Sequence, residues 1–414
     1  MTDAFIAGVG MTRFGRHDAA TVQSLAQSAT ADALADAGIA PEAVQAVVFA
    51  NAVQGAMEGQ FSIRGQCALA QAGFGRAPVI NVENACASAA TALHMAVAHV
   101  RAGIADIVLA VGAEKMTHKD PQRSLAAFDG SWDVHRREQT LAALQKMAAA
   151  MPIPNDALQS AGHSVFMDVY AAFARHHMAR FGTTRAQLAA VAAKNHRHSV
   201  ANPRAQFRKA FSVEEVLAAR PVAWPFTVPM CSAVSDGAAA ALVCSPQAVA
   251  RYGLARQAVK VRAAIMASGG LTDPDDLAGH VSCLAAQSAY EQADVGPQSI
   301  DVVECHDATA FGEILQSETL GFCGFGEGGR LADRGATALG GRIPFNPSGG
   351  LQSKGHPIGA TGLGQIFELV HQLRGVCGQR QVPGARLALA ENGGGLRGIE
   401  EAAIAITILE GPAR

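Results

Sequence analysis

Several common signatures are missing from this sequence of 414 residues. Its eight cysteines form no Cys-x-x-Cys pair, so neither a zinc site nor a disulfide framework is indicated. Charged residues make up only 16 % of the chain and the formal net charge is −2, which gives no electrostatic reason to expect nucleic acid or a membrane surface as a partner. Nowhere do about 18 apolar residues run together, as a membrane-spanning helix requires.

The N-terminus also has no basic segment before an apolar one, so no secretory signal is indicated and we expect a cytosolic protein. Under reducing conditions most of the cysteines act as small buried hydrophobic residues, and at least one is free to serve as a nucleophile. The sequence contains no metal signature, and it implies no permanently bound redox cofactor.

The length and the 49 % share of hydrophobic residues predict two domains or a duplicated fold, with a large buried core and further burial between subunits. Strand-like runs at Ala4–Gly8 and Ala46–Ala50 flank a helical pattern over Val22–Ala37, which Gly38 ends. This alternation predicts a layered α/β fold.

A weak internal repeat divides the chain. In the first half Cys86 opens a predicted helix that ends at Gly103, and the strand Ile107–Gly112 follows. In the second half a helix within Gly355–Gly375 precedes the strand Arg386–Ala390. Each half therefore combines a reactive side chain, a helix start made of small residues, a buried helix and a buried strand.

We place the boundary between the halves within Arg251–Lys260, which divides the chain into 1–255 and 256–414. A segment with a different pattern, at about 117–229, interrupts the first half and contains both tryptophans and most of the His and Arg clusters. Its pattern is helical around Val169–Phe181. Two interpretations stay open: a lid or packing layer over one face of the core, or a substrate-binding segment.

A single cysteine stands where the strand-like run Pro78–Val82 leads into a helix, and Ala, Ser and Thr dominate the residues after it. The dipole and free N–H groups of a helix N-terminus can stabilise the thiolate of Cys86. Small neighbours let a substrate carbonyl approach the sulfur and leave the Cys86 N–H free for an oxyanion. A structural cysteine at a buried helix start would look similar, so this stretch alone leaves both interpretations open.

Two histidines strengthen the catalytic interpretation. His356 stands in the glycine-rich stretch Asn346–Gly364, just before a predicted helix start, where glycines permit positive φ and close backbone approach. The glycine spacing matches neither common phosphate-binding pattern. His306 follows the predicted strand Asp301–Cys305, a position that is often structural. Cys86, His306 and His356 all stand at the ends of predicted helices or strands, and they come from both halves of the repeat. This placement favours one shared site.

These motifs resemble those of thiolases along essentially the whole chain. The resemblance is closest to the sterol-carrier-protein-type and archaeal-type branch, in which a His-Asp motif replaces the Asn-Glu-Ala-Phe of ordinary thiolases. The matching stretches are NACASA around Cys86, SAVSDGAAAALV (232–243), HDAT (306–309), GGLQSKGHPIGATG (349–362) and ENGGG (391–395).

The resemblance implies a five-layered αβαβα fold of two similar halves, with a loop domain inserted in the first. It also implies a homodimer or homotetramer that acts on acyl-coenzyme A, which is a substrate and not a bound cofactor. Some relatives work with a small accessory protein, about which this sequence says nothing.

Carried onto this chain, the resemblance gives each site residue a role. Cys86 would hold the acyl group as a thioester. His356 would accept its proton and, with His306, bind the thioester oxygen of the second substrate. The backbone N–H groups of Cys86 and Gly393 would form the second oxyanion hole, and Ser232 would lie beside the pantetheine arm.

One departure from the family pattern concerns the second acid/base. Ordinary thiolases use a cysteine at the position of Glu391, and the sterol-carrier branch uses one at the position of Ala308. Cys305 points to the opposite face of its strand from His306, which makes it a core residue. Either Glu391 is the acid/base, with a pKa raised by burial, or the acyl group passes to another nucleophile. A non-catalytic acyl-CoA-binding protein is the third interpretation, which the presence of Cys86 and His356 disfavours.

Overall fold

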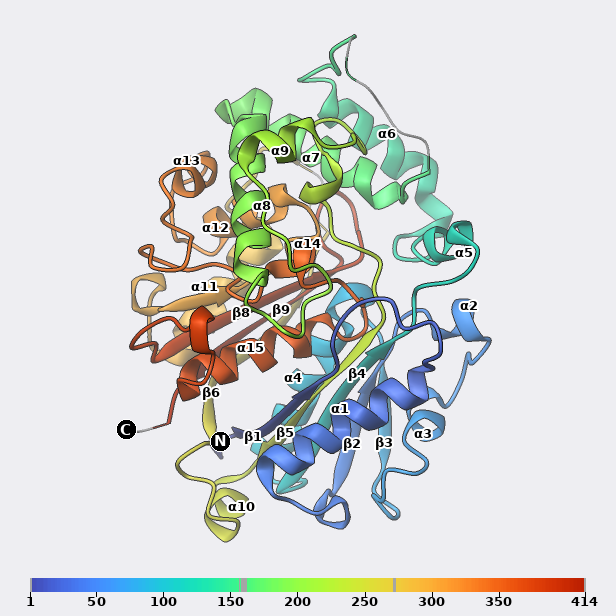
Figure 1. The fold of residues 1–414 in the computed structure, drawn as a ribbon, viewed down its shortest axis with the longest axis vertical. Coiled ribbons are helices and arrows are strands. Elements are labelled where there is room, and N and C mark those ends of the chain that lie inside the picture. The colour runs from blue at the N-terminus through green and yellow to red at the C-terminus, as the bar shows by residue number, and fades with distance from the viewer. Residues whose placement is uncertain (1, 156, 158–161, 271–272, 413–414) are drawn as a thin grey trace.

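The computed structural model describes residues 2–155, 157, 162–270 and 273–412. The strands in these ranges are β1 (Phe5–Met11), β2 (Ala46–Ala50), β3 (Val79–Val82), β4 (Ile107–Glu114), β5 (Gly237–Cys244), β6 (Val259–Ser268), β7 (Val302–Glu304), β8 (Leu387–Gly394) and β9 (Ala403–Glu410). They form a nine-stranded sheet in the order β3-β2-β4-β5-β1-β6-β9-β8-β7 (Figure 1).

The α-helices of the described residues are α1 (Val22–Ala37), α2 (Gln54–Glu58), α3 (Arg64–Ala68), α4 (Ser88–Arg101), α5 (Pro121–Ala126), α6 (Arg137–Ala148), α7 (Val165–Phe181), α8 (Arg185–Ser199), α9 (Val213–Ala218), α10 (Pro246–Arg251), α11 (Val281–Ala293), α12 (Ala310–Thr319), α13 (Gly328–Asp333), α14 (Gly350–Ser353) and α15 (Thr361–Arg374). None of these helices combines the length and the apolar character that crossing a bilayer requires.

The sheet consists of two similar sets of strands. In the first set β1 and β4 pair antiparallel with β5, and β2 pairs parallel with β4. In the second set β6 and β8 pair antiparallel with β9, and β7 pairs parallel with β8. The sets join where β1 meets β6, at the pairs Phe5↔Lys260 and Ile6↔Val259. The repeat seen in the sequence is therefore a repeat of strand order and direction.

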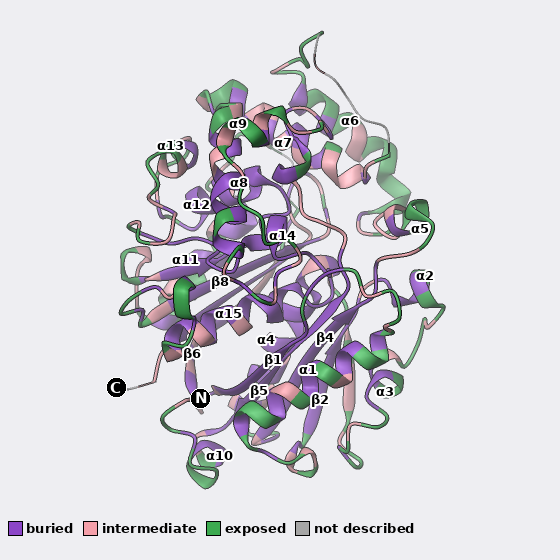
Figure 2. Cartoon of the chain, in the orientation of Figure 1, coloured by how far each residue is buried: buried purple, intermediate pink, exposed green. Residues whose placement is uncertain are grey.

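The helices form three layers around the two sets of strands. α4 and α15 pack together in the middle, in an apolar cluster that joins both sets and includes Leu93, Val108 and Leu369. α1 covers the outer face of the first set and α11 covers the outer face of the second. Figure 2 shows the strands buried between these helices, while α1 exposes one side to solvent. The fold therefore has the expected five-layered αβαβα order, with the two sets of strands joined edge to edge in one sheet.

Local sequence explains how α1 packs so closely. The helix runs over Val22–Ala37, as predicted, between a capping box at Thr21 and a left-handed Gly38. A Cβ on Gly10 of β1 would lie 2.1 Å from the carbonyl oxygen of Ala29. Glycine at this strand position therefore lets the backbone of α1 lie directly on the sheet.

The segment between β4 and β5 forms helices α5 to α9, drawn from teal to green in Figure 1, with α6, α7 and α9 at the upper end of the molecule. The predicted insertion at 117–229 falls within this segment. α8 packs on α12 of the second half through an apolar cluster that includes Leu188, Phe311 and Ile314. The insertion therefore contacts both halves of the core, next to the strand end that leads into His306.

Among the predicted boundaries that differ from the observed ones, two lie next to predicted site residues of the second half. α15 begins at Thr361 and not beside His356. β8 continues to Gly394, beyond the predicted end at Ala390, because it pairs with β9 along its whole length. Glu391 and Gly393 therefore lie within a strand, where we expected a loop after it.

Candidate active site

The backbone around Cys86 forms a tight turn. Cys86 lies in a 3₁₀ turn, η2 (Ala85–Ala87), and α4 begins only at Ser88, so the predicted helix start at Cys86 is two residues early. Ala85 has φ of 47°, in the left-handed region. The Ser88 hydroxyl donates to the Ala85 carbonyl at 2.6 Å and accepts the Asn84 N–H at 2.9 Å. Strained backbone of this kind is concentrated at functional sites.

The surroundings of Cys86 disfavour its thiolate, so the thiol alone is a weak nucleophile. Burial raises its pKa to about 12, and the nearby Glu114 and Glu83 carboxylates add to this, while the N–H groups of Cys86 and Gly395 act in the opposite direction. The expected stabilisation of a thiolate by the helix N-terminus is therefore outweighed by burial. The thiol is protonated at neutral pH and needs a base to react.

An imidazole lies beside this thiol. Nε2 of His356 is 3.3 Å from the Cys86 sulfur, although the two residues are 270 positions apart in the sequence. Nδ1 of His356 lies 2.7 Å from the Thr361 hydroxyl, which itself donates to the Pro357 carbonyl at 3.0 Å. Because the Thr361 hydroxyl donates its proton to Pro357, it can only accept a hydrogen bond from Nδ1 of His356. Nδ1 therefore carries the imidazole proton, and Nε2 presents its lone pair to the thiol.

Burial, with His306 and Lys354 nearby, lowers the pKa of His356 well below its usual value. Burial also lowers the pKa of His306 to about 4. Both rings are therefore neutral at pH 7. Their centroids are 5.2 Å apart at an angle of 65°, and no described residue provides a hydrogen-bond partner for Nε2 of His306. A buried donor of this kind is available to a substrate oxygen.

Asp307, the second residue of the His-Asp motif, is held by several hydrogen bonds. Asp307 is buried and accepts hydrogen bonds from the Leu351 N–H at 2.7 Å, the Gln352 amide at 2.8 Å and the Asn195 amide at 2.9 Å. Burial and Glu313 raise the pKa of Asp307 to about 8. Asp307 therefore anchors the loop that orients His306, tying it to α8 and α14.

Glu391 lies directly behind His306. One carboxyl oxygen accepts the His306 backbone N–H at 2.8 Å, and no described residue bonds the other. Burial raises the pKa of Glu391 to about 8, with a further contribution from Glu401, while the Gly393 N–H acts in the opposite direction. Glu391 therefore does accept backbone hydrogen bonds, but it is not held ionised at neutral pH.

Gly395 is a second candidate, beside the predicted Gly393, for a backbone donor at the site. Its N–H acts to lower the pKa of the Cys86 thiol, whereas the N–H of Gly393 acts to lower the pKa of Glu391. Gly395 also lines the cavity described below, at φ of 67°. Pairing with β9 holds Gly393 within β8, and Gly395 follows the end of that strand.

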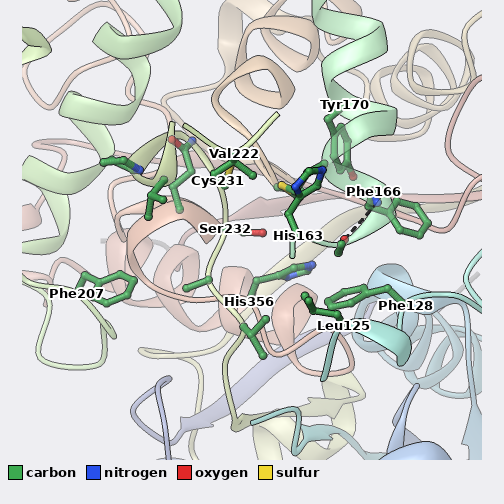
Figure 3. Close-up of a pocket in the computed structure, with 18 of the residues that line it drawn as sticks. Leu125, Phe128, His163, Phe166, Tyr170, Phe207, Val222, Cys231, Ser232 and His356 are labelled. Atoms are coloured by element: carbon green, nitrogen blue, oxygen red, sulfur yellow. Dashed lines mark hydrogen bonds between the residues drawn. The ribbon is translucent and has the colours of Figure 1, made fainter. Parts of the chain in front are cut away.

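A cavity of ≈ 420 Å³ opens onto Cys86 and His356. Ser232 lines it, and Figure 3 shows this serine near His356. Its wall includes the cations Lys209 and Arg220 and the apolar residues Leu125, Phe128, Phe166, Met167, Phe207 and Phe211. In Figure 3 Phe207 lies on one side of His356, with Leu125 and Phe128 on the other.

Tyr170 is a site residue that the sequence did not reveal. It projects from α7 into the cavity (Figure 3), and it also lines a second, smaller cavity of ≈ 60 Å³ that His306 and Glu401 share. Burial raises its pKa well above the usual value, and charge on Cys86, Glu401 and Glu391 adds to this. Its phenol is therefore a neutral donor beside the catalytic group.

The donor atoms of Cys86, His306 and His356 all lie within 4.8 Å of one another, the spacing of a possible metal site among the described residues. The sequence predicts no metal here. A protonated thiol next to a neutral imidazole also forms a proton-transfer pair, and that pair accounts for the arrangement without an ion.

Two family models match the chain: the thiolase N-terminal domain over residues 4–215 and the thiolase C-terminal domain-like family over residues 263–407. Sterol carrier protein 2 of Oryctolagus cuniculus is 38% identical over 402 residues, covering 94% of this chain and 69% of that protein. An acetyl-CoA acetyltransferase of Methanothermobacter thermautotrophicus is 38% identical over 403 residues, covering 96% of this chain and 98% of that protein. The solved Ltp2-ChsH2(DUF35) aldolase has the same fold, with a TM-score of 0.78 at 24% identity, covering 100% of this chain and 98% of that chain.

Proposed function

Because this chain belongs to the thiolase family and is an acyltransferase, we propose that it carries the acyl group of an acyl-CoA on Cys86 as a thioester. The acyl group would then pass to a second coenzyme A derivative by Claisen condensation, or to coenzyme A itself in thiolysis. The observation that supports the nucleophile is the 3.3 Å contact between the Cys86 sulfur and Nε2 of His356. Intact mass measurement after mixing with acyl-CoAs, followed by peptide mapping, tests it.

In the first step the Cys86 proton moves to Nε2 of His356 as the sulfur attacks the thioester carbonyl. The developing oxyanion would accept hydrogen bonds from the N–H of Cys86 and from that of Gly393, as predicted, or of Gly395. Collapse of the tetrahedral intermediate breaks the bond between the carbonyl carbon and the coenzyme A sulfur. The departing thiolate takes the proton back from His356, which leaves acyl-Cys86 and neutral coenzyme A.

In the condensation step Nε2 of His306 would donate a hydrogen bond to the thioester oxygen of the second substrate, and His356 would join it in the tautomer that carries the ring proton on Nε2. Glu391 would remove a proton from the carbon next to that carbonyl. The resulting carbanion would attack the carbonyl carbon of acyl-Cys86, the bond from that carbon to the Cys86 sulfur would break, and the Cys86 thiolate would take up the proton that Glu391 had removed. One observation favours the alternative of transfer to another nucleophile: one Glu391 oxygen is held by the His306 N–H, and Glu391 is absent from the described lining of the cavity.

The charged end of the cavity fits the phosphates of coenzyme A. Lys209 lies over the Phe211 ring, 4.9 Å from its centroid, and Arg220 lines the same cavity. The pantetheine arm would pass Ser232 on its way to Cys86. Coenzyme A derivatives are substrates in this proposal, and no cofactor stays bound.

The two histidines should differ in when they act. We expect His356→Ala to slow both acylation of Cys86 and the later step, each on the order of 10²-fold or more, because it loses a positioned base. His306→Ala should leave acylation nearly unchanged and slow the later step. Single-turnover acylation of both variants measures this. Equal slowing of acylation by both would contradict the division, and the effects need not add.

Tyr170→Phe should slow the later step about 10²-fold, the typical loss of one donor to a developing negative charge, and leave the protein folded. The ring remains and only the hydroxyl is removed. Steady-state kinetics should show a lower kcat with KM little changed. Tyr290→Phe is the matched control, since its hydroxyl donates to the Leu320 carbonyl at 2.8 Å. An unaltered kcat in Tyr170→Phe would refute a role in catalysis.

We also propose a homodimer or homotetramer. β3 (Val79–Val82) is the edge strand of the sheet, and Phe61 and Ile63, which share a surface groove with Val82, are 73% and 61% exposed. Light scattering should find a dimer or larger species at micromolar concentration, and Phe61→Asp should shift it toward monomer. A monomeric parent protein would refute the proposal.

An accessory protein stays a prediction for this chain. The name of the Ltp2-ChsH2(DUF35) aldolase indicates such a partner for that structure. The cytosolic location also stays a prediction.

A further inference from the structure

Two charged residues occupy matching places beside the two histidines. Glu304, the last residue of β7, stands two positions before His306, and Lys354 stands two positions before His356. Their side chains are 0% and 1% exposed, and Nζ of Lys354 lies 3.0 Å from a carboxyl oxygen of Glu304. A buried ion pair therefore joins the strand end that leads to His306 and the loop that leads to His356.

The Glu304 carboxylate also binds the start of that loop. The backbone N–H and the hydroxyl of Ser348 donate to its two oxygens at 2.9 and 2.7 Å. Asp307 binds the same loop at Leu351, so the Lys354 contact is, of these three, the closest in sequence to the second histidine. The attraction within a buried ion pair often fails to offset its desolvation, and its best-attested use is to fix the register of adjacent segments.

The contact of His356 with the thiol has its own supports. The Ser235 hydroxyl accepts the His356 N–H at 3.0 Å, and the Thr361 hydroxyl lies 2.7 Å from its Nδ1. The position of this ring relative to His306 is a separate matter, with centroids 5.2 Å apart. That spacing depends on how β7 and the loop are held together, and the ion pair contributes directly to it.

The two steps of the proposed function place different demands on the histidines. Acylation uses the contact between Cys86 and His356, whereas in the later step both rings must reach one thioester oxygen. A misplacement of about 1 Å can slow a reaction on the order of 10²-fold. The later step is therefore sensitive to the spacing of the histidines, and acylation is not.

We infer that Glu304 and Lys354 are positioning residues, whose buried ion pair sets the spacing of His306 and His356 that the later step requires. This inference rests on the proposed function and adds two residues to it. Both would act through the histidines and not by touching the substrate, since neither is among the described residues that line the cavity at Cys86.

The test is the double variant Glu304→Gln/Lys354→Met, measured for single-turnover acylation of Cys86 and for the later step. Replacing both partners leaves no unpaired buried charge, so the variant should stay folded. The later step should slow about 10²-fold, while acylation and the apparent dissociation constant for acyl-CoA change no more than a few-fold. Glu368→Gln/Arg380→Met is the matched control, since it removes a buried ion pair of the same 3.0 Å length that joins α15 to Arg380, and it should leave both steps unchanged.

The His306→Ala background distinguishes positioning from a general weakening of the fold. Without the His306 ring the spacing no longer matters, so adding the double variant should slow the later step only a few-fold further, far less than the product of the separate effects. Full multiplication of the effects would overturn the inference. Equal slowing of acylation and the later step in the double variant would overturn it as well.

Ser348→Ala tests the same point with both charges kept. It removes the 2.7 Å hydrogen bond to Glu304 and should slow the later step relative to acylation about 10-fold, even if the double variant does not fold. An unchanged ratio of the two rates would contradict the inference and leave the proposed function intact. Absence of Cys86 labelling in the parent protein by every acyl-CoA would instead refute the proposed function.

Discussion

Cys86→Ala is expected to lose all covalent labelling by acyl-CoA and to reduce turnover on the order of 10⁴–10⁶-fold, the range seen when a nucleophile is removed from a unit of cooperating residues. The variant should stay folded, because the Cys86 side chain is small and the turn around it is held by Ser88. Intact mass spectrometry and circular dichroism check the two expectations separately.

Cys231→Ala is the matched control for this prediction. Cys231 lines the same cavity, and burial raises its pKa to about 12, as it does for Cys86. The difference is the imidazole, since Nε2 of His356 is bonded to Cys86. Labelling should therefore persist in Cys231→Ala. Acylation that moves to another cysteine in Cys86→Ala would refute the assignment.

Glu391→Gln is expected to leave acylation of Cys86 nearly intact and to slow condensation, thiolysis and exchange of the donor's α-hydrogens with deuterated water by 10²–10⁴-fold, the usual contribution of a positioned acid/base. Glutamine keeps the shape of the protonated acid and can still accept the His306 N–H through its carbonyl oxygen. The fold should therefore be unaffected.

The pH dependence distinguishes this role from a structural one. Burial raises the pKa of Glu391 to about 8, so at neutral pH most of the carboxyl is protonated and only the minor ionised form can take a proton. The rate of the later step should rise with pH and level off above about 8, and this rise should be missing in Glu391→Gln. A parent protein that transfers acyl groups without any α-exchange would show that another nucleophile is the acceptor, and Glu391 would then only order the loop.

Local sequence was sufficient for much of the fold. The boundaries of α1 and β2 agree with those predicted, since caps and short apolar runs are encoded by neighbouring residues. The extension of β8 through Glu391 and Gly393 could not be predicted in this way. Glycine disfavours strands, and here the pairing with β9 outweighs that preference.

The site was predictable where it depends on motifs and unpredictable where it depends on packing. The glycine-rich loop identified His356, and the structure places it against Cys86. Tyr170 was missed because a tyrosine within an amphipathic helix has no local mark of function, and only the docking of α7 brings it to the cavity. Gly395 was missed for the same reason, since its N–H is directed by the end of a strand that tertiary pairing sets.

The thiol and the imidazole come from opposite halves of the chain and meet only because α4 and α15 share the central layer. The reactive pair therefore does not exist in either half alone. While the chain is being synthesised, Cys86 emerges long before His356, and it has no partner that could activate it until both halves have docked. Cys86 therefore becomes reactive only at the end of folding. The fraction of Cys86 that is covalently labelled then measures the fraction of a protein preparation that has reached its native state.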